Sequence, residues 1–136
     1  MSMTNNLSIF DISGRAMSAQ LVRLNTTASN LANAGTVSGS EDTAFRAMKP
    51  VFRTVMGEAG KATVQVDRID TSTTAPVKRY EPAHPLADKD GNIWEAAVDS
   101  AAEMVEMLET SRQYQNNVQV LATAKGLISE TLRIGS

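Results

Sequence analysis

Apolar residues in heptad spacing at both ends of the chain constrain its fold more than any other feature of the sequence. Near the N-terminus they recur at intervals of 7, 4, 3, 4 and 3, at Phe10, Met17, Leu21, Leu24, Ala28 and Leu31. This spacing places them on one stripe of a helix, as in a coiled coil. Asn33 and Gly35 then favour the end of a helix. We therefore predict a helix from about Ser8 to Asn33.

The C-terminal segment repeats the pattern over a longer run. Its stripe advances in steps of 3 and 4 through Met104, Met107, Ser111, Tyr114, Val118, Leu121, Lys125, Ile128 and Leu132. No proline interrupts residues 96–136, so the pattern predicts one long helix. At a rise of 1.5 Å per residue, about 37 helical residues span roughly 55 Å, and we expect a rod.

Each predicted helix carries a second apolar stripe beside the first. Its members are Ile9, Ile12, Ala16 and Ala19 near the N-terminus, and Val98, Ala101, Val105, Leu108, Val120, Ala124, Leu127 and Ile134 near the C-terminus. The plainest alternative is a monomeric helix pair with a β insert, which would leave these second stripes exposed. Apolar surfaces of that size usually mark an interface. We therefore expect the helices to need more neighbours than one copy supplies.

The middle of the chain has a different character. Phe45–Val55 and Ala62–Ile69 are rich in β-forming residues and are separated by Gly57–Gly60, which predicts a hairpin. The expected organisation is an N-terminal helix within residues 1–34, a loop and hairpin segment over 35–95, and a long helix within 96–136. The fold class is expected to be mainly α, with the terminal helices pairing as a coiled coil around a small β middle.

Composition excludes several classes of protein. Thirteen basic against fifteen acidic residues give a net charge of −2, so no nucleic-acid partner is expected. The absence of cysteine removes disulfides, thiol catalysis and cysteine zinc sites. No apolar run is long enough for a membrane helix, and the N-terminus lacks the pattern of a cleaved signal peptide. We therefore do not expect an integral membrane protein.

One segment has the spacing of a calcium loop. Asp88, Asp90 and Asn92 alternate as EF-hand ligands do, and Asp99 stands at the twelfth position. The sixth position, where an EF-hand needs glycine for its sharp turn, is Ile93. We interpret the segment as a hydrophilic turn and expect no metal ligand there. A calcium-binding module is the distant alternative.

The sequence contains few features that indicate a catalytic site. His84 is the one histidine of the chain and lies in a proline-containing loop. No nucleophile, metalloprotease or phosphate-binding motif accompanies it. A hydrolytic module using His84, Asp88 and Asp90 stays an alternative, but we expect no catalytic residue and no cofactor.

Several segments resemble the bacterial flagellar rod and hook family. Residues 28–34, Ala-Ser-Asn-Leu-Ala-Asn-Ala, are similar to its N-terminal signature, and residues 10–14 precede it as Phe-Asp-Ile-Ser-Gly. Residues 111–121, Ser-Arg-Gln-Tyr-Gln-Asn-Asn-Val-Gln-Val-Leu, are similar to its C-terminal signature. Residues 45–47 and 80–91 resemble the proximal rod member in particular. The motif positions are Ser29, Asn30, Leu31, Ala32, Asn33, Pro85, Leu86, Asp88, Gly91, Arg112, Tyr114 and Asn117.

The resemblance implies a non-enzymatic structural subunit of the flagellar basal-body rod. Such a subunit polymerises through its terminal helices and transmits torque in flagellar motility. Another axial subunit or adaptor of the same family is the alternative. The residues expected to form the assembly seams are Met17, Leu21, Leu24, Ala28, Leu31, Met104, Met107, Tyr114, Val118, Leu121, Ile128 and Leu132.

The resemblance also implies partners and a location. The partners are further copies of the chain, other proximal and distal rod proteins, the rod–ring adaptor and the flagellar type III export apparatus. The location is the periplasmic rod of the basal body, reached by export without a cleaved signal peptide.

Overall fold

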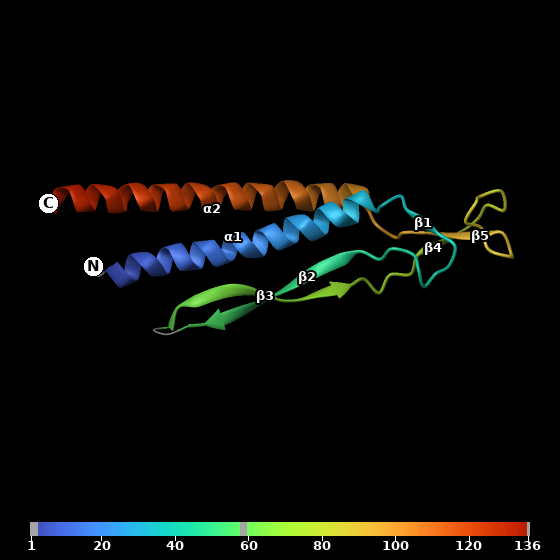
Figure 1. Ribbon diagram of the computed structural model, residues 1–136, viewed down its shortest axis with the longest axis horizontal. Coiled ribbons are helices and arrows are strands. Elements are labelled where there is room, and N and C mark those ends of the chain that lie inside the picture. The colour runs from blue at the N-terminus through green and yellow to red at the C-terminus, as the bar shows by residue number, and fades with distance from the viewer. Residues whose placement is uncertain (1–2, 58–59, 136) are drawn as a thin grey trace.

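Two helices and a long β-hairpin run alongside one another in an elongated molecule, with a small sheet at one end (Figure 1). The computed structural model describes residues 3–57 and 60–135. The elements in chain order are α1 (Met3–Ala32), β1 (Val37–Ser38), β2 (Met48–Met56), β3 (Ala62–Thr71), β4 (Val77–Tyr80), β5 (Asn92–Glu95) and α2 (Ser100–Ile134). Both chain ends lie at the end of the molecule opposite the small sheet.

The expectation of a mainly α fold with a coiled coil is wrong. Helices hold 48% of the residues and strands 21%, and the strands form two antiparallel sheets, so the fold is a mixed α and β one. The sequence pattern missed three of the strands, β1, β4 and β5, because they are two to four residues long. Strands so short show no alternation of apolar and polar residues, and their pairing rests on backbone hydrogen bonds.

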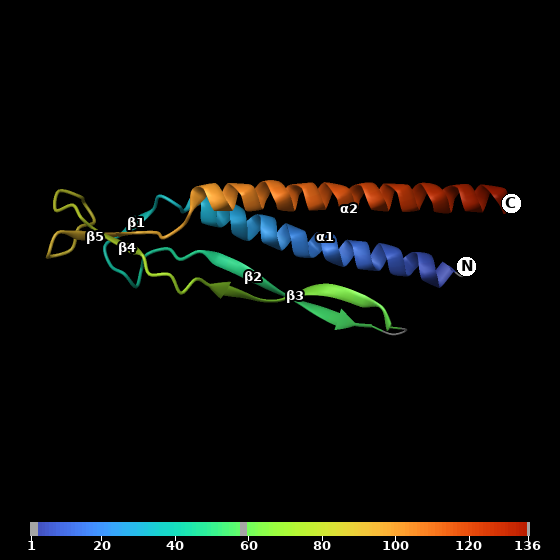
Figure 2. The ribbon, with the colours of Figure 1, turned by 180° about the vertical axis from the view of Figure 1, so that it is seen from behind.

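Helix α1 forms the middle layer of the molecule. Figures 1 and 2 show α2 along one side of it and the β2–β3 hairpin along the other. With neighbours on two sides, α1 has little room for long charged side chains. Its buried residues are accordingly small, namely Ser13, Ala19, Thr26, Thr27 and Asn30.

The hairpin agrees with the two predicted strands, except that β2 starts three residues later than predicted, at Met48, and β3 ends two residues later, at Thr71. It pairs from Met48 with Thr71 to Met56 with Ala62, and its register shifts once, which leaves Asp67 without a cross-strand partner. The Asp67 carboxylate forms ion pairs with arginines on both strands. A bulge and a row of charges discourage a further strand from pairing with an exposed edge.

The small sheet has the strand order β1–β5–β4. Its central strand carries Ile93, which is fully buried and is one of four buried apolar residues in the described ranges, with Ala19, Ala44 and Ala96. The Lys78 ammonium lies 6.0 Å from the centre of the Trp94 ring, a cation–π contact across the neighbouring strands. The apolar core is therefore thin and lies partly at the end of the molecule.

Helix α2 begins at an N-cap. The Asp99 carboxylate accepts hydrogen bonds from the backbone N–H groups of Ala101 (3.1 Å) and Ala102 (3.2 Å). These are two of the amides that a helix N-terminus leaves without partners. The helix therefore starts after Asp99, a few residues later than the sequence pattern alone indicated.

Candidate assembly interface

One face of α2 packs on α1. Its residues follow one another in steps of 3 and 4 and are buried or half-buried, and they are Met107, Thr110, Tyr114, Asn117, Leu121, Ala124 and Ile128. The Asn117 side chain shows that this face points towards α1, because its Nδ2 donates a hydrogen bond to Oε1 of Gln20 on α1 (3.0 Å). Towards the start of α2, the Arg23 guanidinium forms an ion pair with Glu106 through two of its nitrogens. The helix pair therefore combines apolar packing with two polar cross-links.

The predicted stripe of α2 divides between two faces. Every second member lies on the face towards α1, namely Met107, Tyr114, Leu121 and Ile128, whereas Met104, Val118 and Leu132 are exposed. The positions that complete the inner face are Thr110, Asn117 and Ala124. A search for apolar residues passes over Thr110 and Asn117 because they are polar, and it placed Ala124 on the second stripe, whereas Ala124 is half-buried on the inner face.

The predicted stripe of α1 divides in the same way. Met17, Leu24 and Leu31 are half-buried, and they are seven residues apart. Leu21 and Ala28, also seven apart, are exposed. Phe10 is also half-buried, so four of the six residues of the α1 stripe are packed within the chain and two face water. On the α2 stripe, five of nine residues are half-buried and four are exposed.

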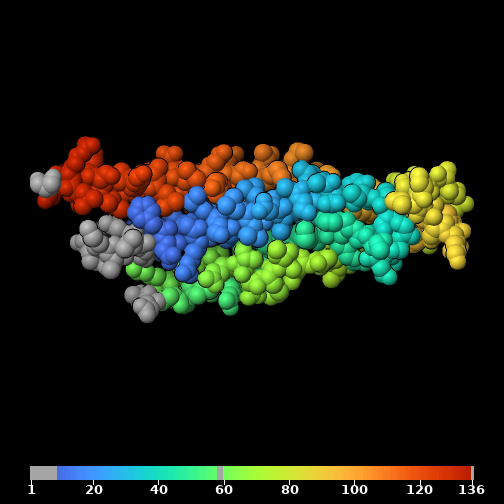
Figure 3. All heavy atoms as spheres, viewed as in Figure 1, coloured from blue at the N-terminus to red at the C-terminus, as the bar shows by residue number. Residues whose placement is uncertain are grey.

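The outer face of α2 is apolar and uncovered by any other described part of the chain. Its exposed large apolar residues are Met104, Val105, Leu108, Val118, Val120, Leu127, Leu132 and Ile134. Val120, Leu127 and Ile134 are spaced by seven residues, so they lie along one side of the helix. Figure 3 shows α2 as an uncovered edge along the molecule. The eight residues are spread around the exposed side of α2, with polar residues such as Glu109 and Thr123 between them. Exposed apolar side chains in this number on one helix indicate a docking surface.

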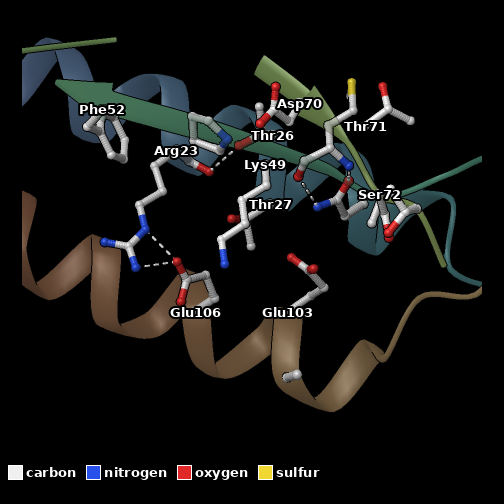
Figure 4. A pocket seen from close by; sticks show the side chains of 16 residues that line it. Arg23, Thr26, Thr27, Lys49, Phe52, Asp70, Thr71, Ser72, Glu103 and Glu106 are labelled. Carbon is white, nitrogen blue, oxygen red and sulfur yellow. Dashed lines mark hydrogen bonds and ion pairs between the residues drawn. The ribbon is translucent and has the colours of Figure 1, made fainter. Parts of the chain in front are cut away.

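A groove of about 730 Å³ lies where the three layers meet. Its lining comes from α1, from the base of the hairpin and from the first turns of α2 (Figure 4). The charged members are Arg23, Lys49, Asp70, Glu103 and Glu106. Since both signs of charge face the groove, it has no strong preference for an anion or a cation.

Comparison with known proteins agrees with the resemblance found in the sequence. Residues 10–38 match the family described as flagella basal body rod protein, and residues 89–134 match the C-terminal family of the flagellar basal body rod proteins FlgEFG. The flagellar basal-body rod protein FlgC of Salmonella typhimurium is 44% identical over 131 residues, covering 95% of this chain and 97% of the relative. The chain belongs to the flagellar basal-body rod family.

Other relatives extend this match. FlgC of Escherichia coli O157:H7 is 46% identical over 95% of the chain and 97% of its own length. FlgC of Aquifex aeolicus is 33% identical over 89% of the chain and 90% of its own length. The protein is therefore a structural subunit of the flagellar basal-body rod, as the sequence resemblance implied. None of the rod subunit's described helices combines the length and apolarity needed to cross a membrane.

The N-terminal motif of the rod subunit joins α1 to the hairpin. The Asn30 side chain is 3% exposed, donates to the Met48 carbonyl (2.8 Å) and accepts from the Met48 N–H (2.8 Å). Asn33 Nδ2 donates to the carbonyl of Ser29 (2.9 Å) in the last turn of α1. Leu31 is half-buried, and Ala32 is exposed. The two asparagines thus form local structural contacts that heptad counting did not reveal.

The motif at residues 80–91 forms a tight turn in the rod subunit. Asp88 Oδ1 accepts the N–H groups of Asp90 (2.9 Å) and Asn92 (2.8 Å), and Gly91 adopts a positive φ of 81°. The Leu86 N–H donates to His84 Nδ1 (3.0 Å), while Pro85 and Leu86 are themselves exposed. Residues 3–57 and 60–135 contain no group of three or more side chains suited to a metal ion. The Asp88 carboxylate therefore accepts hydrogen bonds from the backbone of its own turn, and the Asp99 carboxylate likewise caps the N-terminus of α2.

The C-terminal motif of the rod subunit spreads over different faces of α2. Arg112 is exposed, Tyr114 is half-buried on the inner face, and Asn117 forms the bond to α1 described above. The motif therefore combines a contact within the chain with side chains that point to its surroundings.

Proposed function

We propose that the rod subunit polymerises through its terminal helices, with the outer face of α2 packing against helices of neighbouring rod subunits. The observation that carries this proposal is the run of exposed apolar side chains along α2. Covering them would remove apolar surface from water, which is the main driving force of protein association. The exposed members of the α1 stripe, Leu21 and Ala28, extend the same kind of surface to the second helix.

This arrangement suits the transmission of torque. An α-helix is stiff along its length, and two paired helices resist bending more than one. Neighbours that interlock along α2 would share a load over many side chains instead of concentrating it in one contact. The segment 35–95, with its hairpin and end sheet, then lies beside the helices and supplies lateral contacts.

The family resemblance supports further details of the proposal. We place the subunit in the proximal rod, in contact with further copies of itself, with other proximal and distal rod proteins and with the rod–ring adaptor. It reaches the periplasmic rod through the flagellar type III export apparatus without a cleaved signal peptide. The role is structural and non-enzymatic, with no cofactor.

The substitution Leu127→Asp tests the outer face. Leu127 is 61% exposed, so the isolated chain should keep its fold, whereas a carboxylate buried at an interface loses its hydration. We expect normal export, no rod in isolated basal bodies and non-motile cells. Leu127→Met, which keeps an apolar side chain at the same position, should leave swimming unchanged. Normal swimming of the Leu127→Asp strain would refute assembly through this face.

A further inference from the structure

Helix α2 has two apolar stripes, and hydrophobic burial alone does not decide which of them packs on α1. The inner stripe holds Met107, Tyr114, Leu121 and Ile128. The outer stripe holds Val105, Leu108, Val120, Leu127 and Ile134. The two stripes are similar in size and composition, so burial of either would release a similar amount of free energy. Another interaction must set the rotation of α2 about its own axis.

The polar residues of the inner face supply that interaction. The Glu106 carboxylate forms an ion pair with Arg23, and Asn117 donates a hydrogen bond to Gln20. These two contacts lie about three helical turns apart along α2. The third polar residue of this face, Thr110, is satisfied within its own helix, because its Oγ1 donates to the carbonyl of Glu106 (2.8 Å). In the observed packing, each of these polar side chains of the inner face therefore has a partner.

We propose that the Arg23–Glu106 ion pair, assisted by the Gln20–Asn117 bond, selects the face of α2 that remains outside. The inference rests on the proposed function, in which the outer face binds neighbouring subunits. Leu108 follows Glu106 by two residues, or about 200° around the helix. Rotation that turned the outer stripe inward would bring Leu108 opposite Arg23 and leave a guanidinium against apolar side chains. Arg23 and Glu106 are thus positioning residues, in keeping with the role of partly buried polar pairs in specifying one packing among several.

The groove offers a matched control for this pair. Figure 4 shows Lys49, from β2, lining the same groove as Arg23, Glu103 and Glu106. Lys49 makes no ion pair with any residue of the described ranges. Removing the Lys49 charge changes the electrostatics of the groove and leaves both cross-links in place.

Thiol labelling of the full-length chain tests the proposal. The sequence contains no cysteine, so Met107→Cys or Leu108→Cys creates a single thiol on the inner or the outer face. We expect maleimide to label Leu108→Cys about tenfold faster than Met107→Cys, because the inner thiol must wait for local opening. Adding Arg23→Glu should reduce that ratio to about twofold or below, and adding Arg23→Glu with Glu106→Arg should restore it. Lys49→Ala should leave it unchanged.

Three outcomes would overturn the proposal. The first is equal labelling of the two thiols in the otherwise native chain. The second is an unchanged ratio in the Arg23→Glu background while far-ultraviolet circular dichroism reports native helix content. The third is a loss of helix content in both the single and the charge-swapped background. That result would mean that the native Arg23–Glu106 pair is needed for folding and does not act by selecting which face of α2 packs on α1. These measurements involve no rod, so a failure of the Leu127→Asp test would sink the proposed assembly and leave the labelling result intact.

Discussion

At the scale of single residues, short polar side chains connect the layers of this rod subunit. Asn30 is the clearest case, because its amide meets both the N–H and the C=O of Met48 as an adjacent strand would. Arg15 Nη1 donates to Thr63 Oγ1 on β3 (3.2 Å) and adds a second point of attachment nearer the turn of the hairpin. The hairpin is therefore held on α1 by hydrogen bonds at both ends of its length.

Replacing Asn30 should weaken that attachment strongly. In Asn30→Ala both backbone groups of Met48 would lose a partner in a buried place, so the free energy of unfolding should fall by about 2–4 kcal/mol. Urea denaturation followed by circular dichroism measures the change. Asn25→Ala, at an exposed position of the same helix, should cost less than about 0.5 kcal/mol. Equal losses in the two variants would contradict a docking role for Asn30.

Two glycines with positive φ allow backbone strain and steric crowding to be separated. Gly60 (φ 73°) has no heavy atom of the described residues within 4 Å of an added Cβ, whereas at Gly91 (φ 81°) that atom would lie 2.8 Å from Cε2 of Tyr80 and 3.0 Å from Cβ of Pro82. Gly60→Ala should therefore cost about 1–2 kcal/mol through strain alone. Gly91→Ala should cost at least about 1 kcal/mol more because of crowding. Chemical denaturation of the two variants provides the comparison, and equal costs would exclude crowding at Gly91.

At the scale of elements, the sequence pattern predicted the two helices and the hairpin, but it did not predict the second sheet or which face of α2 packs on α1. The helices and the hairpin follow from periodicity, and their observed bounds lie within a few residues of those predicted. The second sheet was missed because a two-residue strand such as Val37–Ser38 carries no pattern. The inner face of α2 was misjudged because Thr110 and Asn117 are polar. Asn30 was picked out by its motif, but its hydrogen bonds depend on where β2 lies in space.

The N-cap of α2 gives a test at this scale. Asp99→Ala removes the acceptor of two backbone N–H groups, so the free energy of unfolding should fall by about 1 kcal/mol. Asp99→Asn keeps a capping oxygen and should remain close to the parent chain. Asp90→Ala, at an exposed turn position, serves as the control, and denaturant midpoints of the three variants provide the measurement. A loss in Asp90→Ala as large as in Asp99→Ala would argue against the cap.

At the scale of the whole molecule, a thin core coexists with a broad apolar exterior. Apolar residues that are fully covered are few in the described ranges, whereas most of the large apolar residues of α2 face water. A molecule of this kind leaves much of its available burial for contacts with other chains. The fold thus holds α2 in place but leaves most of its large apolar side chains exposed to water.

Self-association of the purified chain should therefore depend on concentration and on the outer face of α2. The double substitution Leu108→Gln and Leu127→Gln removes two apolar side chains of that face and leaves the inner face intact. Sedimentation velocity should show the parent chain forming oligomers as its concentration rises, while the double variant stays monomeric. The double substitution Leu108→Met and Leu127→Met, which keeps apolar side chains at both positions, should behave like the parent. Identical sedimentation of all three would contradict the expectation.

The placement of α1 between its neighbours also has a consequence for the order of events in folding. Gln20 and Asn117 are 97 residues apart in the sequence, and Arg23 and Glu106 are 83 apart. Contacts this distant require closure of a very long loop, and the chain entropy lost in closing it raises the barrier to folding. The hairpin, whose strands are neighbours along the chain, can form early, but α1 waits for the final quarter of the polypeptide before it has both of its neighbours. Until α2 is available, α1 can pack only on the hairpin, through contacts such as Asn30 with Met48 and Arg15 with Thr63, and its side towards α2 stays uncovered.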